Sequence, residues 1–383
     1  MALGNSVLRM PSGDHLNEQP SLITTLLDRT DALLERWYAR VGLWPSSLII
    51  AIALVLVAFI YVDGGTVPVS HGEGYAALSR DPFAQSVSNP FRFRILAPLI
   101  GWVLHLRGPL FILVPWFFLV GFVAMVNVWS RREGAWPSLA LVIMLAMIFS
   151  PVIMHSLVAP GYIEVVSYFL LGMALMNVRS MLVSCACMAL AVMTHESAIF
   201  LTPAWLLAAM SISGKSRRWW AKRLLLLAGM LLPYLAYRFW VVQVDEEALS
   251  AAYYFSYANL RSCVASGPLG TVVGIFAVFR LHWLVLAIPF FMLGLRNGNV
   301  RWALLLVASV GLTLVIAFDT TRMFCWTFPL LVLGSVELGK CVGRKMAVAL
   351  LMVAWILNFL IPPYTTTGAE SYRLKGIRNY VTQ

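Results

Sequence analysis

Long runs of apolar residues, separated by short polar segments, dominate the pattern of this chain. We expect about eleven of them to be spanning helices, at roughly 44–62, 109–129, 137–156, 161–177, 181–194, 197–210, 224–241, 271–295, 302–318, 323–338 and 346–362. Such runs approach the length of helix that crosses about 30 Å of hydrocarbon. Helices satisfy their own backbone hydrogen bonds there. The pattern therefore predicts an all-α, polytopic transmembrane helical bundle, with residues 44–362 as the membrane domain.

The first 43 residues carry charge throughout, and we expect them to remain on the cytoplasmic side. Residues 21–41 predict an amphipathic helix, because apolar residues recur near one face and charged residues lie elsewhere. The apolar residues are Leu22, Leu26, Leu33, Trp37 and Val41. This pattern favours a helix lying in the interface of the inner leaflet. A docking helix for a partner protein is the alternative.

The apolar stretch Phe91–Arg107 is only moderately long, and basic residues flank it. We expect it to lie along the outer surface as a juxtamembrane helix and not to cross. This choice places loops 63–108 and 242–270 and the tail 363–383 outside. The inner side then holds 17 Lys/Arg and 7 Asp/Glu, and the outer side holds 11 and 10. The excess of basic residues inside agrees with the positive-inside rule.

Composition agrees with a membrane protein and excludes several classes. The chain has 383 residues, of which 60% are hydrophobic and 12% are charged, whereas soluble domains are about 25% charged. Its net charge of +11 is explained by membrane orientation and anionic lipid. No motif indicates nucleic acid as a partner. The five cysteines show neither metal-site spacing nor a disulfide framework.

The richest block of candidate chemistry lies in the first outer loop, where His71-Gly-Glu73-Gly-Tyr75 precedes Arg92 and Arg94. Glycine on both sides of Glu73 would let the backbone approach a ligand closely. A carboxylate beside apolar surface can serve as a general base. The planar fork of arginine suits phosphate. The alternative is a polar loop whose arginines reach lipid headgroups.

Two more groups of ionisable residues fall on the predicted outer face. His195 and Glu196 follow a short span, and Thr194 could instead be a helix N-cap there. Earlier in the chain, Glu164 lies in the first turn of the predicted span 161–177, where the helix dipole also favours a carboxylate. His155 ends the preceding span and could face Glu164 across the turn.

A late Asp319-Thr-Thr-Arg322 segment is spaced for an ion pair along a helix. Either this pair closes a turn, or Asp319 holds Arg322 toward a phosphate. Arg280 and His282 are the deepest ionisable residues of the predicted bundle. An arginine at that depth should be paired or face water, unless its span begins later than we expect.

The order of these features resembles bacterial members of the GT-C superfamily, which are multispan glycosyltransferases using polyprenyl-phosphate-linked sugars. The resemblance covers roughly residues 44–340 and rests on loose motifs. These are an acidic residue and a tyrosine in the first outer loop, a Pro-Phe-Arg-x-Arg-Ile-Leu-x-Pro segment, a His-Glu-Ser segment and a late Asp-x-x-Arg segment. The family often shows paired acids in the first loop, whereas here Asp63 and Glu73 are ten residues apart.

The resemblance implies roles for these residues. Glu73 would be the catalytic base, with Asp63 as its competitor, and the lipid phosphate would rest on Arg92, Arg94 or Arg322. The sugar would be transferred with inversion on the outer face of the bacterial inner membrane.

The resemblance leaves the cofactor unknown. A divalent metal on Glu73, Asp81 and His71 would be compatible with the spacing, which is not diagnostic. Two other classes stay open: a lipid or solute transporter, and a non-enzymatic assembly or binding subunit of a membrane complex. The latter would dock through residues 21–41 and the C-terminal tail.

Overall fold

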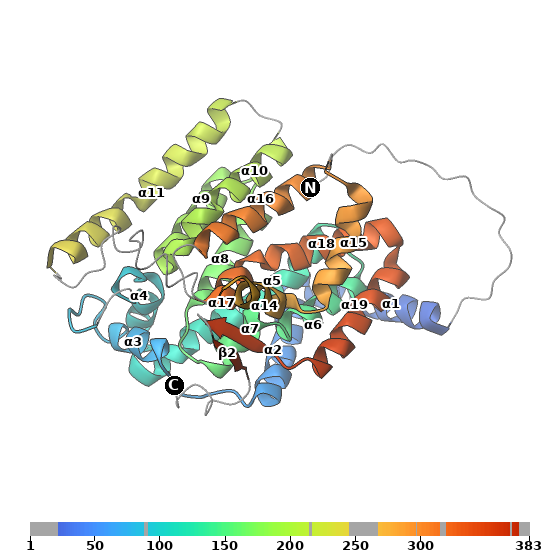
Figure 1. The fold of residues 1–383 in the computed structure, drawn as a ribbon, viewed down its shortest axis with the longest axis horizontal. Coiled ribbons are helices and arrows are strands. Elements are labelled where there is room, and N and C mark those ends of the chain that lie inside the picture. Colours follow the sequence, from blue (N-terminus) through green and yellow to red (C-terminus); the bar gives the residue numbers. More distant parts are fainter. Residues whose placement is uncertain are drawn as a thin grey trace.

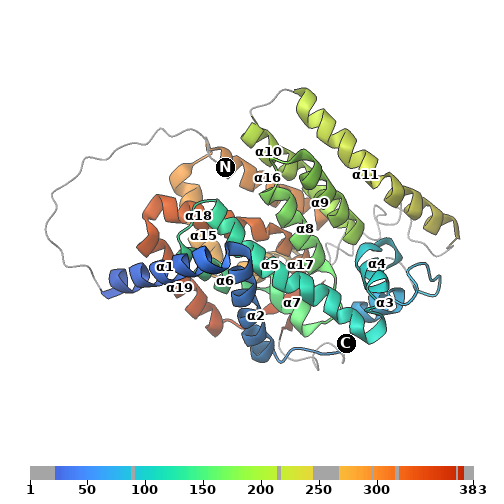
Figure 2. The ribbon, with the colours of Figure 1, turned by 180° about the vertical axis from the view of Figure 1, so that it is seen from behind.

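The protein is a helical bundle with a small β-hairpin, shown by the computed structural model in Figures 1 and 2. The structure describes residues 22–87, 91–213, 217–244, 267–295, 297–314, 319–367 and 370–374. Most of the predicted loop 242–270 and the last nine residues of the predicted tail lie outside this part of the chain.

The first half of the chain contributes α1 (Leu22–Val41), α2 (Leu43–Val62), α3 (His71–Leu78), η1 (Phe91–Phe93), α4 (Leu96–Val103), η2 (Gly108–Ile112), α5 (Leu113–Arg132), α6 (Pro137–Ile148), α7 (Pro151–Val158), α8 (Glu164–Met176) and α9 (Met181–Thr194). The second half contributes η3 (Glu196–Leu201), α10 (Thr202–Ser213), α11 (Arg217–Val244), α14 (Gly267–Phe279), α15 (His282–Leu293), α16 (Gly298–Thr313), α17 (Thr320–Phe324), η4 (Cys325–Thr327), α18 (Phe328–Val342), α19 (Arg344–Leu360), β1 (Tyr364–Thr367) and β2 (Glu370–Arg373). The described chain is thus mostly helical, as predicted.

Several of these helices are long and apolar enough to cross a membrane. Four qualify by length and composition, at Leu43–Val62, Gly108–Arg132, Trp219–Gln243 and Thr320–Val342. Two bent pairs, α6 with α7 at 48° and α14 with α15 at 89°, would raise the number to six. The apolar helices at Glu164–Met176, Met181–Thr194, Glu196–Met210 and Gly298–Thr313 are shorter. The predicted total of about eleven spans remains a prediction.

The segment Phe91–Arg107 forms no long helix. It contains η1 and the eight-residue α4, and eight residues of α-helix extend only about 12 Å. This length is too short to cross the membrane, so the structure favours the predicted surface position.

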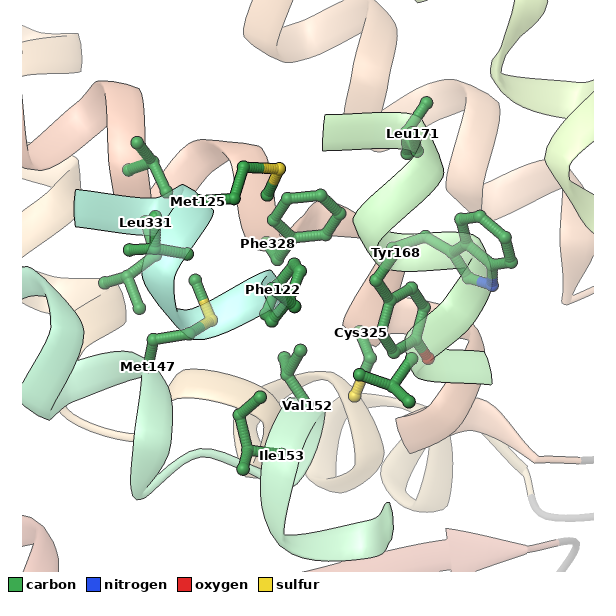
Figure 3. Packing of buried hydrophobic residues seen from close by; sticks show 14 of the residues in the cluster. Phe122, Met125, Met147, Val152, Ile153, Tyr168, Leu171, Cys325, Phe328 and Leu331 are labelled. Atoms are coloured by element: carbon green, nitrogen blue, oxygen red, sulfur yellow. The ribbon is translucent and has the colours of Figure 1, made fainter. Parts of the chain in front are cut away.

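The centre of the bundle is built from aromatic side chains of α5, α8 and α18 and sulfur-containing side chains of α5, α6 and η4 (Figure 3). The rings of Phe122 and Phe328 meet edge to face at 4.9 Å, and Tyr168 lies 6.0 Å from Phe328. A Cβ on Gly172 would fall 2.3 Å from the methyl group of Met125. Glycine therefore allows α8 to approach α5 closely, as small residues do where van der Waals packing holds membrane helices together.

The amphipathic helix α1 lies against the bundle (Figure 2). Its acidic residues make ion pairs with the bundle. Asp31 accepts a 2.6 Å hydrogen bond from Arg344 at the start of α19, and Glu35 pairs with Arg131 at the end of α5. The predicted apolar residues are exposed on the opposite face: Leu22, Leu26, Leu33, Trp37 and Val41. This arrangement agrees with a helix that offers its apolar face to lipid.

Part of the predicted C-terminal tail is an ordered hairpin. Tyr364 pairs with Arg373 in the antiparallel register of β1 and β2, and the Leu374 side chain is buried. The backbone N–H of Thr366 donates to the Thr321 hydroxyl at 2.9 Å. The hairpin thereby covers α14 and α17 at one end of the bundle, so residues 364–367 and 370–374 of the predicted tail pack against it.

Candidate functional site

Ten polar side chains from separate segments meet at one end of the bundle, and we call them the polar cluster. They come from α3, the residue after η1, α7, the turn that follows α7, the start of α8, the start of η3 and the start of α17. The members are His71, Tyr75, Arg94, His155, Tyr162, Glu164, His195, Glu196, Asp319 and Arg322. Seven of them were predicted as site residues: Tyr75, Arg94, His155, Glu164, His195, Glu196 and Arg322.

One half of the polar cluster is organised by Arg94. Its Nε and Nη2 donate to the two carboxylate oxygens of Glu196 at 3.0 and 2.9 Å, and Nη1 donates to the Tyr75 hydroxyl at 3.0 Å. Burial raises the pKa of Tyr75, so the hydroxyl stays protonated. Burial by itself would lower the pKa of Arg94, but the negative charge of Glu196 outweighs this effect. The pKa of Arg94 therefore lies well above the usual value. Arg94 and Glu196 therefore form a bidentate ion pair, the strongest common type.

The other half is organised by Arg322. Its Nε donates to Asp319 at 2.5 Å, and its Nη1 donates to Glu164 at 3.0 Å. Asp319 also caps α17, because its other carboxylate oxygen accepts the backbone N–H of Arg322 at 3.0 Å. The predicted ion pair between Asp319 and Arg322 is confirmed.

An aromatic and histidine stack lies beside Arg322. The ring of Tyr162 stacks on His71 with centroids 5.2 Å apart and contacts His155 edge to face at 4.8 Å. The Arg322 guanidinium lies 5.3 Å from the Tyr162 centroid, within cation–π range. Burial, and then the charge of Arg322, lower the pKa of His71 to about 4. His71 is therefore neutral at physiological pH.

The prediction missed Tyr162, although it follows directly on the Pro160-Gly161 turn signal. A tyrosine at that point of the sequence gives no sign that His71, from a distant segment, will stack on it while His155 of the preceding helix contacts its edge.

Glycines set the position of this stack. A Cβ on Gly72 would lie 2.3 Å from the carbonyl oxygen of Pro160, and Gly161 has a φ of +92°. The start of α3 therefore lies directly against the α7–α8 turn, backbone to backbone. We expected Gly72 to open the chain to a ligand, and the structure shows that it serves close packing instead. Gly74 likewise faces the ring of Phe91, 3.3 Å from where its Cβ would be.

The two predicted catalytic carboxylates lie outside the polar cluster. Glu73 is exposed on α3, and it points away from His71 and Tyr75, since these are four residues apart on one helix face and Glu73 is two from each. Asp63 is exposed where α2 ends, in a left-handed conformation with φ of 54°.

Arg92, a predicted phosphate ligand, is buried on η1. Its backbone carbonyl accepts a 2.9 Å hydrogen bond from Tyr237 of α11. Arg92 thus helps to place α11 against the segment that carries Arg94.

The start of η3 is capped differently from what we expected. His195 Nδ1 accepts the backbone N–H of Ser197 at 3.3 Å, whereas the Thr194 hydroxyl donates to Leu190 within α9. His195 is 2% exposed and its ring lies 5.8 Å from Trp326. The alternative of Thr194 as the cap is wrong, and His195 takes this role.

The charges of the polar cluster nearly balance. Three carboxylates (Glu164, Glu196 and Asp319) face two guanidinium groups (Arg94 and Arg322). Glu164 is 4% exposed, and its Oε2 has no hydrogen-bond partner among the described residues. An unsatisfied buried oxygen is costly, so this atom is suited to accept a hydroxyl or N–H from a ligand.

The suggested metal site finds no support in the geometry. In the part of the chain that the structure describes, no three His, Cys, Asp or Glu side chains are placed to hold a metal ion. Asp81 caps its own turn by accepting the backbone N–H of Phe83 at 3.1 Å, so it does not join His71 and Glu73.

Comparison with known proteins assigns no function to this chain. No family model, no curated protein and no solved structure matches this chain.

Proposed function

We propose that this protein is a membrane glycosyltransferase of GT-C type in the bacterial inner membrane. It would transfer a sugar from a polyprenyl-phosphate donor to an acceptor on the outer face. The observation that supports this proposal is the polar cluster, in which Arg94 and Arg322 both act electrostatically on His71, Glu164 and His195. Two arginines at one buried site are suited to a lipid-linked phosphate.

The donor phosphate would compete with the carboxylates that hold these arginines. Glu196 is the most exposed of the ion-paired carboxylates in the polar cluster, with a side chain that is 22% exposed compared with 6% for Glu164 and 7% for Asp319. We therefore expect the ion pair between Arg94 and Glu196 to break when phosphate binds Arg94. Arg322 keeps Asp319 as its anchor and supplies the second positive charge.

In the proposed reaction, Glu73 acts as the general base. Its carboxylate is exposed on α3 and would remove the proton of the acceptor hydroxyl. The acceptor oxygen then bonds to the anomeric carbon, and the bond from that carbon to the phosphate oxygen breaks. The electron pair leaves with the phosphate, where the arginines stabilise the negative charge. Attack opposite the leaving group inverts the anomeric carbon.

The proposal keeps the predicted topology of about eleven spans with the polar cluster outside. It requires the shorter apolar helices, among them α8, α9 and α16, to cross within the bundle. In the bundle α8 packs against α5 and α9, α9 packs against α11, and α16 packs against α10. A helix shorter than the hydrocarbon layer can be accommodated by local thinning of the bilayer.

A second candidate function is a non-enzymatic subunit that binds a partner. It is favoured by the pairing of both cluster arginines with carboxylates, and by the separation of Glu73 from the polar cluster. The exposed apolar face of α1 would then be a docking surface and not a lipid contact. The transporter alternative rested on Arg280 and His282. The Arg280 guanidinium donates to the backbone carbonyls of Asn358, Ile361 and Phe149, which gives this arginine a structural role.

Sugar transfer by the purified protein in liposomes separates these candidates, with a panel of polyprenyl-phosphate monosaccharides as donors. We expect Glu73→Gln to lower the rate by about 10²-fold or more. Asp81→Asn, an exposed acid of the same loop, is the matched control and should retain the rate. Full activity of Glu73→Gln would exclude Glu73 as the base. Binding of a donor without any transfer by the unchanged protein would favour the subunit.

A further inference from the structure

Four large apolar side chains are exposed at the corner where α3, α4 and η2 meet (Figure 1). They lie at the end of α4 and in η2, and we call them the corner patch. The exposed fractions are 41% for Trp102, 58% for Val103, 58% for Leu104 and 55% for Leu110. A single exposed apolar side chain is ordinary, whereas several together mark a surface that contacts a partner or a membrane.

The backbone beneath the corner patch is held in place by hydrogen bonds. The Ser79 hydroxyl accepts the backbone N–H of Gly108 at 2.9 Å and donates to the Ala76 carbonyl at 2.7 Å. The backbone N–H of Leu106 donates to the Gly101 carbonyl at 2.8 Å. The corner patch therefore belongs to the folded surface.

Two exposed arginines border the corner patch. Arg80 follows α3, and Arg107 directly precedes η2. Gly108 has φ of +60°, and a Cβ there would lie 2.7 Å from Arg80 Nε, so this glycine lets the Arg80 guanidinium lie against the backbone beside Arg107. The Arg107 guanidinium lies 5.6 Å from the ring centroid of Trp102, within cation–π range. Positive charge and apolar surface therefore adjoin.

The charges of these two arginines are not balanced within the described part of the chain. Neither forms an ion pair with a carboxylate there. Arg107 makes one long hydrogen bond, from Nη2 to the Trp102 carbonyl at 3.4 Å. The neighbouring carboxylate of Asp81 accepts the backbone N–H of Phe83 instead. Since a guanidinium has five N–H bonds, both arginines keep donors for an anion from outside.

The position of the corner patch indicates where that anion comes from. An apolar helix of 25 residues, long enough to cross a membrane, runs from Gly108 to Arg132. The corner patch thus lies where this helix would leave the membrane. Tryptophan is typical of this boundary, and arginine there places its charge among the headgroups. A ligand that offers both an apolar part and an anion at this level is a phospholipid.

We propose that this corner binds an anionic phospholipid of the leaflet at this end of α5. Arg80 and Arg107 hold its phosphate, and the corner patch contacts the upper part of its acyl chains. A headgroup without an ammonium is preferred, because an ammonium would compete with the arginines for the phosphate. The site is separate from the polar cluster and does not depend on the proposed sugar transfer.

The test measures lipid binding by the full-length protein in detergent, using native mass spectrometry. Three probes are compared: dioleoyl phosphatidylglycerol, dioleoyl phosphatidylcholine as the zwitterionic control, and glycerol 3-phosphate as the control without chains. The double variant Arg80→Gln with Arg107→Gln removes both charges of the corner. The matched control is Arg132→Gln with Arg179→Gln, which removes two exposed arginines elsewhere.

We expect the unchanged protein to bind phosphatidylglycerol at least tenfold more tightly than either other probe. An arginine near anionic lipid contributes about fivefold to binding, so the corner variant should bind phosphatidylglycerol about 25-fold more weakly. The matched control should retain its affinity. All four replaced arginines are exposed, so neither double variant should lower the unfolding midpoint.

Three results would overturn the proposal. The first is equal binding of phosphatidylglycerol and either control probe by the unchanged protein. The second is an equal effect of the two double variants on phosphatidylglycerol binding. The third is a dimer of the unchanged protein that Leu104→Asp dissociates, which would show that a second copy covers the corner patch.

Discussion

The ion pair between Arg94 and Glu196 joins segments 102 residues apart, and replacing Glu196 with glutamine tests whether it holds the polar cluster together. The amide keeps the shape of the side chain but has one acceptor oxygen in place of two. Arg94 would then keep its charge with one fewer hydrogen bond, in a place where its side chain is only 12% exposed.

The expected loss follows from this burial. Removing one partner of a buried ion pair costs about 3–5 kcal/mol, chiefly because the remaining charge is unpaired. Since the Glu196 side chain is 22% exposed, solvent relieves part of this cost, and we expect about 3 kcal/mol. Arg94→Gln should cost a similar amount. The double replacement leaves no unpaired charge, so its cost should fall short of the sum by about 1–3 kcal/mol.

The free energy of unfolding can be followed by tryptophan fluorescence as sodium dodecyl sulfate is added to the protein in mild detergent micelles. The pair of Lys340 and Glu337 on α18 provides a control. The lysine side chain is 47% exposed, so Glu337→Gln leaves a solvated charge and should cost less than about 1 kcal/mol. Strictly additive effects of the two cluster replacements would refute the reasoning. So would a Glu196→Gln variant that is no less stable than Glu337→Gln.

Three further outcomes are expected. Gly72→Ala should destabilise the protein by more than about 2 kcal/mol, since its Cβ would meet rigid backbone; Gly229→Ala, in open space on α11, should change the unfolding midpoint little or raise it. The pKa of His71 is about 4 in the folded protein and about 6.5 when unfolded, so stability should be full above pH 6.5 and fall as the pH drops toward 4. His71→Gln should flatten that slope in a pH series of thermal unfolding, and an unchanged slope would contradict the assignment. Arg344→Gln removes the partner of Asp31 and should speed proteolysis of α1 in micelles, whereas an unchanged cleavage rate would show that this contact does not hold the helix.

The grouping of ionisable residues at one end of the bundle was the informative prediction from sequence. Threading the apolar runs through a bilayer placed Arg94, Glu164, Glu196 and Arg322 on one face, and the structure brings all four into one site. Amphipathic spacing likewise predicted α1 and the residues of its exposed face. These successes share a cause, because apolar periodicity and charge depend on the local chain and on the solvent that surrounds it.

The partners within the site could not be predicted in the same way. Arg94 with Glu196, and Arg322 with Glu164, are separated by 102 and 158 residues, and sequence spacing says nothing about such pairs. The family resemblance and the flanking glycines both predict Glu73 as the base, but the glycines serve close packing and Glu73 is exposed. Local composition indicated which residues were unusual, while the packing of distant helices decided which of them meet.

The contact of Gly72 with the α7–α8 turn has a genetic consequence. A Cβ on Gly72 would strike the Pro160 carbonyl at 2.3 Å, and one on Gly161 would lie 2.8 Å from the Gly72 Cα. A clash between side chains can be repaired by shrinking the partner, but a carbonyl and a Cα are present whatever the residue. A suppressor screen that starts from Gly72→Ala should therefore return true revertants and no compensating change at residues 160 or 161.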